Sequence, residues 1–175
     1  MAISLGHAKI VVKNFERLSK ALSKAEWEAE SRYSTTNLDV RKISKQNYQY
    51  LLKTLLSDYS EEDQASIWNE VYHESPYRNL DSVAIDFFKL RQKRRTFDLL
   101  QYGDTLYGWA YKIDCWMTGD MLASLTAQIR EQAPRDFDKR IRSWSLDRSS
   151  GKGRRCRLPS LQNPACRFPA RGSST

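Results

Sequence analysis

The short stretch "WMTGD" places Trp116 and Asp120 four residues apart, where a polar turn is expected to become a helix. Residues four apart share one helical face, so an indole and a carboxylate would lie side by side near a helix N-terminus. Such a pair can stabilise a cation, the carboxylate by its charge and the indole by the negative face of its ring. The alternative is a structural one: an acidic residue in the first helical turn, favoured by the macrodipole, above a packed Trp.

Other residues with reactive side chains have simpler explanations. Asp114, two residues before the Trp, could be a second acid, but we favour a helix N-cap. Cys115 has no histidine near it in the sequence to activate its thiol. The basic run at 89–95 could track a phosphate backbone, although a solvated helix end that favours cations is the preferred interpretation. Three large aromatic residues at helical positions are expected in the core: Trp68, Tyr72 and Trp109.

Length and composition restrict the class of protein. The 175 residues fit one domain with its own core, and they contain no run of about 18 apolar residues that could cross a membrane. The first residues do not resemble a secretory signal. Three cysteines and two histidines without metal-ligand spacing predict neither a disulfide framework nor a zinc site. We therefore expect a cytoplasmic protein with no metal, no cofactor and no membrane partner, and we expect a monomer.

The net charge of +8 is concentrated at the C-terminus. Residues 146–175 contain seven Arg and Lys side chains against Asp147, so the bulk charge is a weak argument for DNA binding by the rest of the chain. Residues 148–175 are rich in Pro, Gly, Ser and Arg and lack an apolar helical face. Two interpretations stay open for this tail: a basic, disordered segment, or an aberrant C-terminus of the kind a frameshift produces.

The apolar spacing before the tail is helical almost throughout, which predicts an all-α fold without a sheet. One helix is expected within residues 8–24, and another over 40–55, capped by Thr36 or Asn37. Ser60 should cap the next helix, and a further helix should follow the Ser75-Pro76 break. The helix after Trp116 should end before Pro134. These helices fit either an irregular bundle or stacked antiparallel pairs.

Four segments in order resemble the DNA alkylation repair family of glycosylases, which is built from HEAT-like helical repeats. They are "YSTTNLDVRKISKQ", "IWNEVYHESPYRNLDSVAIDFFKL", "LYGWAYKIDCWMTGDMLASL" and "IRSWSLD", and the resemblance covers about residues 8–147. It implies a HEAT-like α-solenoid of stacked antiparallel pairs. The helical-repeat domain would then span residues 1–147 and be incomplete relative to the family, with 148–175 as the tail.

The resemblance also implies roles for individual residues. Trp116 and Asp120 match the family's W-x-x-x-D element, whose Asp faces the lesion and whose Trp lies against the deoxyribose. Tyr33 matches an aromatic that contacts DNA, and Arg41 matches a basic residue that opens the next helix. Trp144 belongs to a "W-S" turn, after which the family's Arg-containing helix has no counterpart here.

By this resemblance the chain is a monofunctional DNA glycosylase that excises N3- or N7-alkylated purines from double-stranded DNA without a cofactor. Because the later repeats have no counterpart, we expect weak activity or none in the chain as given. Two alternatives stay open. One is a non-catalytic helical-repeat module that binds DNA or protein, and the other is an inactive truncated product.

Overall fold

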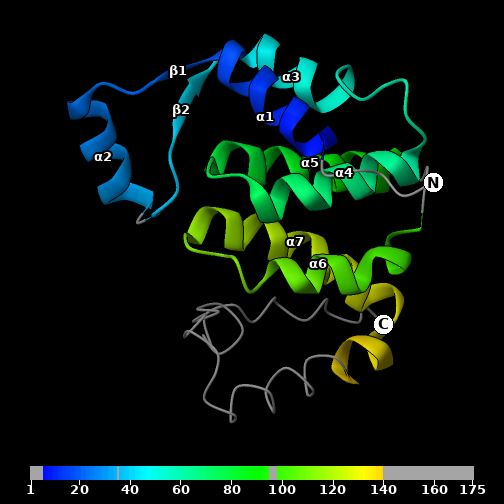
Figure 1. Ribbon diagram of the computed structural model, residues 1–175. Coiled ribbons are helices and arrows are strands. Elements are labelled where there is room, and N and C mark those ends of the chain that lie inside the picture. Colours follow the sequence, from blue (N-terminus) through cyan, green and yellow to red (C-terminus); the bar gives the residue numbers. More distant parts are fainter. Residues whose placement is uncertain (1–5, 35, 95–97, 140–175) are drawn as a thin grey trace, which may run out of the picture.

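The computed structural model of the chain describes residues 6–34, 36–94 and 98–139, and this part is mostly helical (Figure 1). Its elements are, in chain order, α1 (Gly6–Leu18), β1 (Ser19–Ala21), α2 (Lys24–Ser34), β2 (Arg41–Ile43), α3 (Lys45–Lys53), α4 (Glu61–Glu74), α5 (Arg78–Arg94), the 3-10 turn η1 (Leu99–Tyr102), α6 (Gly103–Trp109) and α7 (Trp116–Gln132). Residues 134–139 are also helical. The predicted all-α class is confirmed.

All the numbered α-helices except α2 form three layers of two, with α1 and α3 in the first layer, α4 and α5 in the second, and α6 and α7 in the third (Figure 1). The middle layer packs against both others, α1 and α3 on one side and α6 and α7 on the other. Because α4 and α5 pack together and are joined by a short turn, they run antiparallel. A HEAT-like solenoid remains a prediction.

The middle layer supplies the core because α5 repeats apolar residues at helical spacing. Its residues Leu80, Val83, Ala84, Phe87 and Phe88 are fully buried. On the facing helices the rings of Tyr72 and Trp109 stack with centroids 4.1 Å apart, and Trp68 is equally buried. The prediction that these three aromatic residues belong to the core is confirmed.

The boundaries of α4 and α7 follow the local signals in the sequence. Ser60 caps α4 as predicted, and its side chain accepts a hydrogen bond from the Asp63 amide. α5 begins after the Ser75-Pro76 break, and α7 ends at Gln132, before Pro134. These boundaries depend on neighbouring residues, which is why the sequence predicts them.

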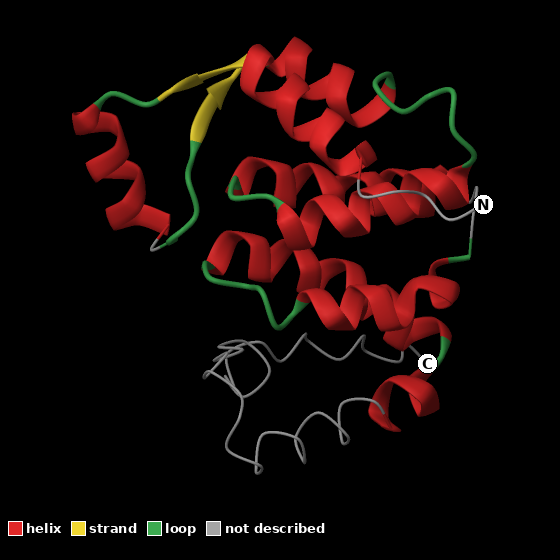
Figure 2. Cartoon of the chain, in the orientation of Figure 1, coloured by secondary structure: helices red, strands yellow, loops and turns green. Residues whose placement is uncertain are grey.

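The predicted absence of a sheet is wrong, because β1 and β2 pair as a two-stranded antiparallel sheet. α2 lies between the two strands in the chain and stands away from the three layers (Figures 1 and 2). We call residues 19–43, which contain β1, α2 and β2, the arm. The helix expected within residues 8–24 accordingly ends at Leu18. There the Ser19 hydroxyl donates to the carbonyl of Phe15, and the chain turns into β1.

The predicted helix over residues 40–55 is also wrong at its start. Residues 41–43 form β2, and α3 begins only at Lys45. Ser44, rather than Thr36 or Asn37, is the N-cap, and its side chain accepts from the Asn47 amide at 3.1 Å. The apolar residues Val40 and Ile43 imitate helical spacing with the residues of α3, although they lie before the helix.

The described helices include none that is both long and apolar enough to cross a lipid bilayer. The predicted domain boundary between residues 147 and 148, the tail and Trp144 all lie outside the described residues.

Candidate functional site

Tyr33 and Trp116 are 83 residues apart in the sequence and meet in space. Trp116 is the first residue of α7, and Tyr33 lies in the last turn of α2. The indole Nε1–H donates to the Tyr33 carbonyl at 3.0 Å, and the rings meet edge to face with centroids 5.4 Å apart. Both remain accessible, with exposed fractions of 63% for Tyr33 and 43% for Trp116. The structure thus brings together two of the predicted site residues as an open aromatic surface.

Asp120 is exposed and lies about one turn along α7 from Trp116, on the same helical face. The structural alternative, an acid in the first helical turn, is wrong because α7 begins at Trp116 and its first turn contains no acidic residue. The macrodipole acts mainly within that first turn, so it gives little reason for a carboxylate at this position.

Asp114 is not the helix cap that we favoured. Cys115 is the N-cap residue, with extended backbone and no side-chain hydrogen bond to the amides of the first turn. The Asp114 carboxylate instead reaches the loop after α2. There, its Oδ2 accepts from the Thr36 hydroxyl at 2.6 Å and from the amides of Asn37 and Leu38 at 2.8 and 3.3 Å. Sequence spacing gave no sign of this contact, because its partners are more than 70 residues away.

Arg41 lies in β2, and its side chain contacts residues in and beside the sheet rather than the aromatic pair. Its Nε donates to the Ser19 hydroxyl at 2.8 Å, and its guanidinium lies over the Tyr77 ring, 5.6 Å from the centroid. These contacts fasten β2 to β1 and to the turn before α5. The predicted DNA-binding role of Arg41 has no support in these contacts, and Trp144 lies outside the described residues.

An ion pair with a buried carboxylate, which the sequence did not predict, involves a residue close to Asp114 in the chain. Lys112 Nζ contacts Asp81 Oδ1 at 3.2 Å and donates to the carbonyls of Tyr72 and Ser75. Burial raises the pKa of Asp81 to about 7, although the Lys112 charge acts in the opposite direction. Lys112 thus ties the loop between α6 and α7 to the first turn of α5 and to the end of α4, and these contacts hold the loop that leads into Trp116.

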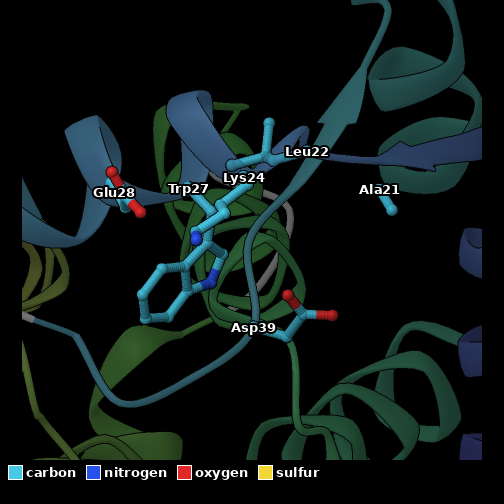
Figure 3. Close-up of a pocket in the computed structure, with 6 residues that line it drawn as sticks. All are labelled: Ala21, Leu22, Lys24, Trp27, Glu28 and Asp39. Carbon is cyan, nitrogen blue, oxygen red and sulfur yellow. The ribbon is translucent and has the colours of Figure 1, made fainter.

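A pocket of about 350 Å³ lies within the arm, between α2 and the segments that join this helix to β1 and β2 (Figure 3). It is lined by Ala21, Leu22, Lys24, Trp27, Glu28 and Asp39. Trp27 is 45% exposed, so its indole is open to solvent. None of the predicted site residues lines this pocket.

No group of three His, Cys, Asp or Glu side chains in the described part of the chain is arranged to hold a metal ion. Comparison with known protein families, with curated proteins and with solved structures finds no match for this chain. Its function must therefore be inferred from the site itself.

Proposed function

We propose that the chain is a DNA repair protein of the glycosylase type, which releases N3- or N7-alkylated purines from double-stranded DNA. The observation that supports this best is the meeting of Tyr33 with Trp116, both accessible, with the exposed Asp120 about one helical turn further along α7. The resemblance of the segments around these residues to the DNA alkylation repair family predicts the same three side chains.

The proposed reaction is hydrolysis of an N-glycosidic bond. An alkylated purine carries a positive charge, so the bond between C1′ and the base nitrogen can break without prior protonation of the base. The electron pair of the bond goes to the base and neutralises it, while positive charge develops on the sugar, as in glycoside hydrolysis. Water then adds to C1′ and loses a proton to solvent, giving an abasic sugar and a free base.

The two α7 side chains would act on the charge that develops on the sugar. Asp120 offers a fixed negative charge and can orient the attacking water, a form of preorganised electrostatic stabilisation. Trp116 offers the negative face of its indole to the same cation, and the hydrogen bond to Tyr33 holds the ring in place. The rings form an open surface rather than a closed pocket, which suits attack on a nucleotide that stays in the duplex.

The proposal can be tested by binding as well as by turnover. One duplex carries a cationic pyrrolidine in place of the sugar, and a matched duplex carries neutral tetrahydrofuran. We expect tighter binding to the cationic duplex, and we expect Asp120→Asn to remove most of that preference. Glu131→Gln makes the same charge change on an exposed residue of α7, about 16 Å along the helix, and should leave it unchanged.

Base release is the second measurement, with a duplex that contains N7-methylguanine. Where release is detected, Asp120→Asn should slow it about 10²-fold, the scale of losing one preorganised electrostatic group. Affinity for undamaged duplex should hold or rise, because a carboxylate repels phosphate. Equal binding of both duplexes by the unaltered protein would contradict the proposal.

A second candidate is a non-catalytic helical-repeat module, and the charge of α2 favours a protein partner for it. α2 carries Glu26, Glu28 and Glu30 against Lys24 and Arg32, a balance that does not attract phosphate. Such a module needs no carboxylate at Asp120. Equal binding to the two duplexes, together with no base release, would favour this candidate over the enzyme.

A further inference from the structure

α2 packs against the rest of the molecule with almost no apolar contact. Among the described residues of α2, Ser34 is the one that is buried, and the two large rings of the helix, Trp27 and Tyr33, are both exposed. An isolated helix of 11 residues is marginal in water, and its stability in a protein normally comes from a buried apolar face. Something other than hydrophobic packing must therefore fix the position of α2.

Polar contacts at the C-terminal end of α2 supply that fixation. Glu30 forms an ion pair with Arg78 at 2.6 Å, and the Arg78 side chain is 8% exposed. Beyond the helix, the Asp39 amide donates to the Pro76 carbonyl at 2.9 Å, and the Arg78 amide donates to the Asp39 carbonyl at 3.0 Å. The ion pair is the first attachment of the arm to the start of α5, and this pair of backbone hydrogen bonds is the second.

The third contact attaches the arm to the start of α7, and it depends on one carboxylate. Asp114 Oδ2 accepts from three donors within residues 36–38, which we call the docking loop. Hydrogen bonds to a charged acceptor are about twice as strong as neutral ones. Thr36 is buried, so its hydroxyl would lose a partner away from water if the carboxylate were removed.

We propose that Asp114 is a positioning residue, which docks the end of the arm onto the start of α7 and so holds Tyr33 against Trp116. The two ends of this arrangement are close in sequence, since Asp114 precedes Trp116 by two residues and Tyr33 precedes Thr36 by three. Two connections then join the same segments: the carboxylate with the docking loop, and the indole with the Tyr33 carbonyl. Asp114 itself touches no substrate, and it acts through the aromatic pair.

The consequence for activity rests on the proposed function. If Trp116 stabilises positive charge on a sugar, the orientation of its indole matters, and Asp114 sets that orientation through Tyr33. Removal of the carboxylate should then reduce the preference for a cationic sugar without weakening general affinity for duplex DNA. Part of the effect should pass through the edge-to-face contact with the Tyr33 ring, so it should be smaller in a protein that lacks this ring and keeps the Tyr33 carbonyl.

The position of the indole is tested first, by following the Trp116 indole N–H signal in ¹⁵N NMR spectra of the full chain, assigned with Trp116→Phe. We expect Asp114→Ala to shift this signal and to speed its exchange with water about tenfold, because the hydrogen bond to Tyr33 is loosened. The signals of the buried indoles of Trp68 and Trp109 should stay in place. Asp114→Asn, whose side-chain oxygen can still accept, should restore most of the native signal.

Glu28→Ala is the matched control, because it removes one negative charge from an exposed residue of the same arm. It should leave the Trp116 signal unmoved. An unmoved Trp116 signal in Asp114→Ala would overturn the proposal. If Asp114→Ala does not fold, Thr36→Val decides, since it removes one donor and keeps the shape of the side chain. Loss of the Trp68 signal in both variants would also overturn it, because Asp114 would then support the core.

The functional step is tested with the cationic and neutral duplexes. Asp114→Ala should lower the preference for the cationic duplex about tenfold, and its effect should be smaller in a protein that already carries Tyr33→Ala. Additive losses would contradict the link through Tyr33. If the unaltered protein shows no preference, the proposed function fails, while the indole signal still decides whether Asp114 positions the pair.

Discussion

The middle layer and the arm are held by opposite kinds of interaction. In α4 and α5 fully buried aromatic and aliphatic side chains pack together, including Trp68, Phe87 and Phe88. In α2, by contrast, the large rings face solvent, and polar contacts from Asp114 and Arg78 fix the helix. Apolar packing is strong but has little directional preference, whereas hydrogen bonds and ion pairs fix orientation at a smaller gain in stability. The core should therefore control folding, and the arm contacts should control the geometry of the site.

The largest expected effect comes from removing a core ring. Trp109 is fully buried, stacks on Tyr72, and donates from Nε1 to Asn69 Oδ1 at 2.8 Å. Trp109→Ala should lower the free energy of unfolding by about 3–5 kcal/mol, measured by denaturant titration, because it opens a large cavity and leaves Asn69 without this donor. A loss below about 1 kcal/mol would mean that the packing of α6 against the middle layer is not a main source of stability.

Trp68 sharpens this prediction, because its buried Nε1 has no hydrogen-bond partner among the described residues. Trp68→Phe removes an N–H that already lacks a partner, whereas Trp109→Phe breaks a hydrogen bond. Both changes reduce ring volume by the same amount. Trp109→Phe should therefore cost about 1 kcal/mol more than Trp68→Phe, and equal costs would contradict the hydrogen bond to Asn69.

An intermediate effect is expected from Asp81, the buried acidic residue that pairs with Lys112. Burial raises the pKa of Asp81 from 3.8 to about 7. The folded protein then binds more protons than the unfolded chain between about pH 4 and 7, so this contribution to stability is present at low pH and is lost as the pH rises. The slope is at most about 1.4 kcal/mol per pH unit for one group.

The measurement is the difference in unfolding free energy between the unaltered protein and Asp81→Asn at several pH values. Because asparagine does not titrate, the unaltered protein should lose stability relative to the variant as the pH rises from 4 to 7. A difference that does not change with pH would show that Lys112 keeps Asp81 ionised throughout, and that the ion pair dominates over burial.

The contrast between the two regions also separates what the sequence predicts from what it does not. The starts of α4 and α5, and the end of α7, follow from Ser60, Pro76 and Pro134, because caps and proline act on neighbouring residues. The core aromatic residues follow from helical spacing. The face shared by Trp116 and Asp120 follows from the same rule, since both lie on one helix.

The arm could not be predicted in this way. Its strands have three residues each, "SKA" and "RKI", too few to show the alternation that marks a strand. The bonds from the docking loop to Asp114 join residues 76 to 78 positions apart, and no local pattern encodes such a pairing. Arg41 illustrates the same limit: its position matched the motif of the family, yet its side chain contacts Ser19 and Tyr77.

The smallest expected effect is on the arm itself and completes the comparison. Trp27 is as large as Trp109, but it is 45% exposed and belongs to a helix held by polar contacts. Trp27→Ala should lower the free energy of unfolding by about 1 kcal/mol at most, because the half-exposed indole buries far less apolar surface than Trp109. The Trp116 indole signal should also stay in place, since Trp27 takes no part in the contacts of Asp114. A loss comparable to that of Trp109→Ala would mean that the pocket beside Trp27 is closed in solution and that apolar packing holds the arm after all.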